Sequence, residues 1–576
     1  MAGVVMRVPS KQHFELAKQL QESIETSLSS KCFNNAVFFA DKLLTLIQTL
    51  GMIDLRENAY WGLANAYYGR REWDRAHDAF CEFIHIPKFL YMAAKCMEEC
   101  NEWTKCLLIL GEDENEFTKK IEKMDDHKVA ACLCFIRAKS FDMMENKDRA
   151  AIWYRATIQK DSSFYEAFEK LVDNDLISHN EGTSLLDNLN FSESQEWLKL
   201  MYELKLSKFS THKDYRFDRS VQLLDEKYSL GTNSDVIAAQ AGHYFNVQNY
   251  QKAYQLSKSI IDVDIFHPIV ALHVSILVAL NRTCDLFRVA HELVDQYKNS
   301  AVTWYAVGSY YYCISKHEQA RNFFKKSTLL DKHFLPSWIG IGHSFAESDE
   351  TDQALAAYRT AYRLFASSHI PALCIAMEYT RTNNFPLAEQ FLHLAITFCD
   401  NDPMIYNEMG VVLFKTKRFE EALTCFATGI EKSPLGQLLA TSPSSEAFDQ
   451  SNSSLHIYEP ILFNYANTFR KLKQYEQALK YYQLCLRFNQ KWIVLSAIGF
   501  THHLLGNLHD AIEHYHKATF LKNDDTFTAT MLGKALFQIT IQTVDYVICN
   551  DQEEEEDPEE EDNLYSSSSF AVVNKI

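Results

Sequence analysis

The sequence predicts an all-α chain, a superhelical solenoid of helix–turn–helix repeats, and three observations lead to this fold class. Glycine and proline number only 17 and 11 among 576 residues, and these residue types most often interrupt a helix. A short motif with a central alanine returns at a fixed interval through the second half of the chain. Within each interval, small and large side chains also return at fixed positions, which is typical of stacked repeats.

The interval is that of the tetratricopeptide (TPR) repeat, a pair of helices in about 34 residues. In the six clearest units, the eighth and twentieth positions carry only glycine or alanine, because the two helices cross closely there. Large residues, often aromatic, occupy positions 4, 11 and 24 and fill the gaps between helices. We therefore predict that twelve small residues pack the repeats together: Gly308, Ala320, Gly342, Ala354, Ala376, Ala388, Gly410, Ala422, Ala466, Ala478, Gly499 and Ala511.

The chain divides at the places where this repeat phase is lost. The first half keeps the pattern with more substitutions, and residues 111–126 read as a charged connector. A Ser-rich stretch later separates two repeats, and acids dominate the last residues. The predicted order, with about thirteen repeats and a capping helix, is an N-terminal extension (1–16), N-terminal repeats (17–204), a linker (205–233), central repeats (234–434), an inserted loop (435–456), C-terminal repeats with the capping helix (457–549) and a disordered acidic tail (550–576).

Composition excludes several classes of protein. The net charge is −19, ten acids fall within residues 551–562, and no basic stripe suggests nucleic-acid binding. The 14 cysteines form no CxxC pair, so we interpret them as small buried residues in a reducing compartment. The N-terminus lacks the apolar core of a signal peptide, and no apolar stretch approaches the roughly twenty residues of a membrane span. We expect a soluble, intracellular protein without membrane contact.

No motif indicates an enzyme. The sequence has no P-loop, no GxSxG, no HExxH and no kinase motifs. The pairs His502–His503 and His514–His516 cannot each share a helical face at their spacing. We predict no catalytic residues, no metal and no cofactor.

Stacked repeats form a concave groove, lined by the first helix of each unit. Its lining is apolar and aromatic with scattered amide and basic groups, a composition that suits an extended peptide. Some of these residues could instead pack within the chain. The lining has one arginine and no lysine, which argues against a clamp for acidic tails. The groove residues predicted from position are Asn407, Phe463, Asn467, Arg470, Phe500 and His503.

Three stretches go beyond what a TPR unit requires: GHSFA at 342–346, EYTRTNN at 378–384 and DDTFTATMLG at 524–533. On these, the chain resembles the cell-division-cycle-sixteen family, the sixth subunits of the anaphase-promoting complex (cyclosome). The resemblance covers roughly residues 30–545. It implies a non-catalytic TPR scaffold in a multisubunit cullin–RING ubiquitin ligase that acts in cell division, located in the nucleus and cytoplasm.

The resemblance also implies partners. Other TPR and scaffold subunits would stack against the chain, and the N-terminal repeats, about 17–168, would form a homodimer. A very small accessory subunit would lie in the groove between about 369 and 537, with Glu408, Asn464 and Arg470 as polar contacts. The competing readings are a TPR adaptor of a chaperone or transport complex, and an enzyme with a TPR front end, for which the repeats leave little room.

Ser442 precedes a proline within the inserted loop. Proline-directed kinases act on such exposed sites, so Ser442 is the candidate for phosphorylation. The alternative is an unmodified linker.

Overall fold

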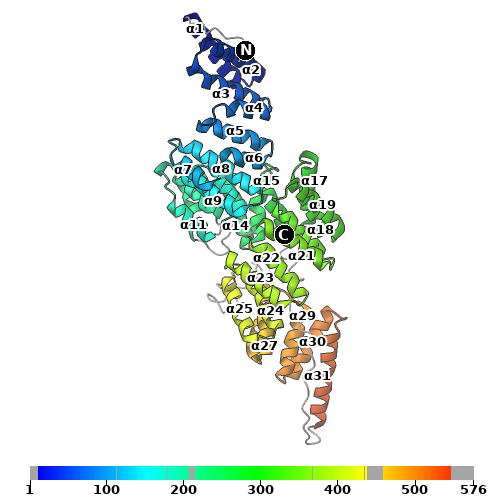
Figure 1. Ribbon diagram of the computed structural model, residues 1–576. Helices are drawn as coiled ribbons and strands as arrows, with labels where there is room; N and C mark the ends of the chain where they lie inside the picture. Colours follow the sequence, from blue (N-terminus) through cyan, green and yellow to red (C-terminus); the bar gives the residue numbers. More distant parts are fainter. Residues whose placement is uncertain are drawn as a thin grey trace. The chain divides into compact units, whose positions relative to one another are not determined.

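The computed structural model describes residues 11–111, 113–174, 176–177, 179–206, 215–365, 368–433, 435–436 and 458–545 (Figure 1). Throughout these ranges the regular structure is helical, without a strand. The predicted all-α TPR solenoid is confirmed. The N-terminal extension up to residue 10, most of the inserted loop with Ser442, and the acidic tail lie outside the described residues.

The chain forms two compact units, Met1–Ile177 with Asp187–Leu198, and Ser178–Leu186 with Lys199–Ile576. The first unit contains α1 (Lys11–Ser29), α2 (Phe33–Leu50), the 3-10 turn η1 (Ile53–Leu55), α3 (Arg56–Gly69), α4 (Trp73–Cys81), α5 (Pro87–Glu99), α6 (Trp103–Leu110), α7 (Glu114–Glu122), α8 (His127–Met143), α9 (Lys147–Lys160) and α10 (Tyr165–Asp173). The division between units falls within α11 (His179–Asn188) and α12 (Glu196–Leu206), which flank η2 (Glu193–Gln195).

In the second unit, each helix packs mainly against its neighbours in sequence. Its helices are α13 (Tyr215–Glu226), α14 (Ser234–Asn246), α15 (Tyr250–Ile261), α16 (Val270–Ala279), α17 (Thr283–Gln296), α18 (Ala301–Cys313), α19 (His317–Leu330), α20 (Leu335–Ala346), α21 (Thr351–Leu364), α22 (His369–Arg381), α23 (Phe385–Phe398), α24 (Pro403–Lys415), α25 (Phe419–Lys432), α27 (Glu459–Lys471), α28 (Tyr475–Phe488), α29 (Trp492–Leu504), α30 (Leu508–Leu521) and α31 (Thr526–Asp545).

The two helices of a repeat are joined by a turn with one left-handed residue at position 15. Such a conformation is uncommon outside glycine, so its regular return marks the repeat independently of side-chain packing. The same turn recurs in the degenerate first half, where the repeat phase is weak in the sequence. The residues with this positive φ, between 56° and 80°, include Lys31, Arg71, Asn101, Glu145, Gln248, Ser315, Asp349, Asn383, Lys417, Lys473 and Gly506.

The small residues at position 8 lie under the aromatic ring at position 24 of the same repeat. A β-carbon added to Gly308, Gly410 or Gly499 would lie 2.6, 2.5 or 2.8 Å from the ring of Phe324, Phe426 or Tyr515 respectively. Gly342 meets Tyr358 in the same way. All twelve predicted packing residues are buried in the structure.

Two segments differ from the sequence-based expectation. The charged connector at 111–126 contains α7, which is capped by Asp113, whose carboxylate accepts the backbone N–H of Asn115 at 3.0 Å. The linker at 205–233 contains α13. Each polar segment carries two apolar residues on one helical face that reach the core, Phe117 and Ile121 in α7 and Phe217 and Leu224 in α13. These few buried contacts, rather than the mean polarity of the segment, determine that a helix forms.

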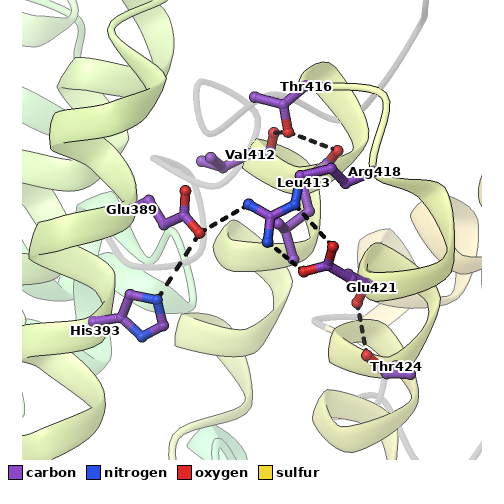
Figure 2. A network of polar contacts seen from close by, with 8 residues as sticks. All are labelled: Glu389, His393, Val412, Leu413, Thr416, Arg418, Glu421 and Thr424. Atoms are coloured by element: carbon purple, nitrogen blue, oxygen red, sulfur yellow. Dashed lines mark hydrogen bonds and ion pairs between the residues drawn. The ribbon is translucent and has the colours of Figure 1, made fainter.

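An ion-pair network links consecutive repeats on the surface (Figure 2). Arg418, the residue before α25, donates from Nη1 to Glu389 Oε1 of α23 at 3.0 Å and from Nε to Glu421 Oε1 at 2.9 Å. His393 lies 4.0 Å from the Glu389 carboxylate. The network therefore ties the turn of one repeat to the second helix of the repeat before it.

Candidate partner-binding surface

The predicted groove residues lie on α24, α27 and α29, the first helices of three successive repeats. Six of the eight are buried within the chain, with exposed fractions of 0–7 %: Asn407, Glu408, Phe463, Asn464, Asn467 and Phe500. Arg470 and His503 are half-buried. The structure thus brings the eight residues together along consecutive helices, and leaves Arg470 and His503 as the more accessible ones. Their role as partner contacts stays a prediction.

A chain of buried polar side chains joins α24 to α27. Asn464 donates from Nδ2 to Asn407 Oδ1 at 3.1 Å, and Asn407 donates from Nδ2 to Glu408 Oε1 at 3.1 Å. Burial raises the pKa of Glu408 to about 7, with the Asn407 hydrogen bond opposing the shift. Burial also lowers the pKa of Lys415, at the end of the same helix. These side chains couple two repeats across the position of the inserted loop.

On α27 and α29, most of the remaining predicted residues contact aromatic side chains. The Tyr482 hydroxyl of α28 donates to Asn467 Oδ1, and its ring lies 5.7 Å from that of Phe463. The Arg470 guanidinium lies 5.0 Å from the centre of the Phe500 ring, a distance typical of a cation–π contact.

The hydrogen bond between a tyrosine at position 24 and a polar residue at position 9 was not predicted from the sequence. The same pair occurs as Tyr358 and His343, 2.7 Å apart. A polar residue at position 9 together with tyrosine at position 24 is therefore the signal that would have revealed these contacts.

The last helix, α31, has a face without a second helix. Gly533 holds position 8, yet no atom lies within 4 Å of the place where its β-carbon would stand. Leu536 and Phe537 follow on α31 and are 44 % and 67 % exposed. Over Gly308, Gly342, Gly410 and Gly499, the second helix of the repeat places an aromatic ring. The face of α31 beside Gly533 is therefore left uncovered by the described part of the chain.

The first unit exposes apolar side chains near its beginning. Phe14 and Leu16 on α1, and Phe38 on α2, are 54 %, 43 % and 58 % exposed. Exposed large apolar side chains on a surface can mark a place of interaction with another protein.

The described residues contain no group of three or more His, Cys, Asp or Glu side chains arranged to hold a metal ion. Among these same residues, no helix is long and apolar enough to cross a membrane.

Comparison with known proteins places these features in a family context. Residues 30–113 match the family described as anaphase-promoting complex, cyclosome, subunit 3, and residues 459–491 match a tetratricopeptide repeat family. The chain is 34 % identical to anaphase-promoting complex subunit 6 of Arabidopsis thaliana, over 92 % of this chain and 98 % of that protein. It is 32 % identical to the cell division cycle protein 16 homolog of Homo sapiens, over 90 % of this chain and 84 % of that protein.

A solved structure is also similar along most of its length. It is the crystal structure of the APC/C hetero-tetramer Cut9–Hcn1, with a TM-score of 0.71 and 28 % identity. The similarity covers 90 % of this chain and 96 % of the solved chain.

Proposed function

The chain belongs to the family of anaphase-promoting complex subunit 6, the cell division cycle 16 proteins, and from this membership we propose that it is a TPR scaffold subunit of that ubiquitin ligase. It organises the assembly of other subunits and contributes no catalytic step of its own. It acts in cell-cycle-regulated protein degradation, in the nucleus and cytoplasm.

The C-terminal repeats hold a small accessory subunit. The observation that carries this proposal is the open face of α31, where Gly533 lacks the covering ring found over Gly308, Gly410 and Gly499. A partner helix with an aromatic or branched side chain over Gly533 would complete the repeat. The similar crystal structure is of a hetero-tetramer of Cut9 with Hcn1, which supports a partner of this kind.

The groove beside α31 would receive an extended segment of the same small subunit. Arg470 and His503 are its accessible polar groups. Asn407, Glu408, Asn464 and Asn467 would form the supporting wall, since their side chains are buried.

The N-terminal repeats form a homodimer surface. Exposed Phe14, Leu16 and Phe38 support this assignment, because each exposed apolar side chain gains stability when a second copy covers it.

The test compares variants of the tagged full chain purified from dividing cells. We expect Phe537→Glu to lose a very small co-purifying protein, because a charge would be buried under the partner helix. Leu329→Glu is the control, as Leu329 is 81 % exposed on α19. Retention of the small protein by Phe537→Glu at wild-type yield would show that α31 is not its seat.

Charge reversal at Arg470 tests separately whether the groove binds the small subunit. Arg470→Glu is preferred to any variant that truncates Phe463, because Phe463 is 1 % exposed and its removal would destabilise the repeat itself.

A further inference from the structure

The polar chain of Glu408, Asn407 and Asn464 ends in two oxygen atoms that accept no hydrogen bond. Both donors in the chain are amide nitrogens, and they point in one direction, from Asn464 to Asn407 to Glu408. Glu408 Oε2 and Asn464 Oδ1 are buried and have no hydrogen-bond partner among the described residues. A buried acceptor without a hydrogen-bond donor destabilises the fold, and one hydrogen atom shared between these two oxygens would remove that cost.

Lys415 only partly offsets the cost of burying an ionised Glu408, because burial is the largest cause of its pKa shift. Lys415, on the same helix, is the one cation whose field acts on the carboxyl group, and it forms no ion pair with it in the described structure. Several charged groups of the helices packed against α24 are engaged in ion pairs with other residues. These are Glu378 with Arg381 on α22, Glu389 of α23 and Glu421 of α25 with Arg418, and Glu459 of α27 with Lys491.

We propose that below neutral pH Glu408 is a neutral carboxylic acid in the folded chain, and that its Oε2 hydroxyl then donates to Asn464 Oδ1 and closes a three-residue ring between α24 and α27. One proton then satisfies both orphan oxygens. The direction of donation around the ring is uniform, from Glu408 to Asn464 to Asn407 and back to Glu408. The inference concerns the isolated chain and does not depend on the proposed partners.

This proton makes the contact between the two repeats sensitive to pH. Glu408 has a folded-state pKa of about 7, raised by burial from 4.5. Stability from a group with a raised pKa is fully present below its unfolded pKa and is lost as pH rises toward the folded pKa. The ring should therefore weaken between about pH 4.5 and pH 7, and change little at higher pH.

Hydrogen exchange of the full chain tests the proposal, with peptides from α24 and α27 compared between wild type and Glu408→Gln at each pH. Glutamine keeps the shape and a donor but cannot ionise. We expect the variant to be more slowly exchanging at pH 7.5, and its advantage over wild type to grow on the order of fiftyfold between pH 5 and pH 7.5. The ratio at one pH removes the intrinsic dependence of exchange on pH.

Glu459→Gln is the matched control, since Glu459 is also buried on α27 but is paired with Lys491 at 3.0 Å. It should exchange faster than wild type at pH 7.5, the opposite sign, because the ion pair is lost. Faster exchange of Glu408→Gln at both pH values, or a ratio independent of pH, would overturn the proposal and indicate an ionised Glu408 held by water or a cation.

Asn464→Leu provides a second test, because the pH of the transition would stay the same if Asn464 only filled space. Removal of the acceptor should shift the wild-type pH transition to lower pH, because the neutral acid loses its hydrogen bond. An unmoved transition would contradict the ring.

Discussion

At the scale of single residues, a glycine at position 8 and a ring at position 24 are one packing unit. The ring of Phe426 occupies the volume where Gly410 would carry a β-carbon. A larger side chain at either position alone would clash with the other residue, because protein interiors are closely packed.

Gly410→Leu should therefore destabilise its repeat by about 1–3 kcal/mol through overpacking. Denaturant unfolding of the full chain, with hydrogen exchange to locate the effect, measures this. Gly242→Ala is the control, because the nearest atom to its added β-carbon would be Leu272 Cδ2, at 3.9 Å. Equal stability of Gly410→Leu and wild type would show that Phe426 moves aside freely.

At the scale of elements, the last helix behaves differently from the first helices before it. Gly499 and Gly533 hold the same repeat position, yet only Gly499 is covered. The same substitution at the two sites should then have opposite effects.

Gly533→Ala should stabilise α31 by about 0.5–1 kcal/mol, because alanine loses less backbone entropy in a helix. Gly499→Ala should destabilise, since its β-carbon would lie 2.8 Å from Tyr515 Cδ1. Thermal unfolding of the two variants gives the comparison. The stabilised Gly533→Ala should nonetheless bind the small accessory subunit more weakly, if the partner helix approaches this glycine. If both variants were stabilised, or both destabilised, the result would contradict the open face of α31.

The repeats could be predicted from the sequence because a packing rule repeats without regard to surface charge. Gly308, Gly342 and Gly410, for example, fall at the same position of the repeat and so predict where its helices lie. Helices α7 and α13 could not be predicted in this way, because a few buried side chains, such as Phe117 and Phe217, outweigh a polar composition.

The candidate site was predictable only in part. Repeat position in the sequence put Asn407 and Asn467 on the first helices of their repeats, where the structure has them, on α24 and α27. The bond from Asn464 to Asn407 depends on a contact between two repeats, and the bond from Tyr482 to Asn467 depends on how the two helices of one repeat pair.

At the scale of the whole molecule, stability is approximately a sum of repeat and neighbour terms. Damage from Gly410→Leu should therefore remain near α24 and α25, while α1 to α10 keep wild-type protection from hydrogen exchange. Loss of protection throughout the chain would contradict this one-dimensional picture.

The proposed dimer surface belongs to the same scale. Phe38→Glu should convert a homodimer into a single chain of 66.6 kDa, because a charge replaces an apolar contact at the interface. Sedimentation analysis of the purified chain measures the mass. Loss of the dimer by Leu329→Glu instead, or a wild type that sediments as a single chain, would place the surface elsewhere or remove it.

The central claim is that this chain is a scaffold of the anaphase-promoting complex. Affinity purification of the tagged wild-type chain from dividing cells under mild salt, followed by mass spectrometry, tests it most directly. The account predicts recovery of a cullin–RING pair, other TPR subunits and one very small protein. Recovery of chaperones or transport factors without those subunits would contradict the proposed function and leave the solenoid fold unchanged.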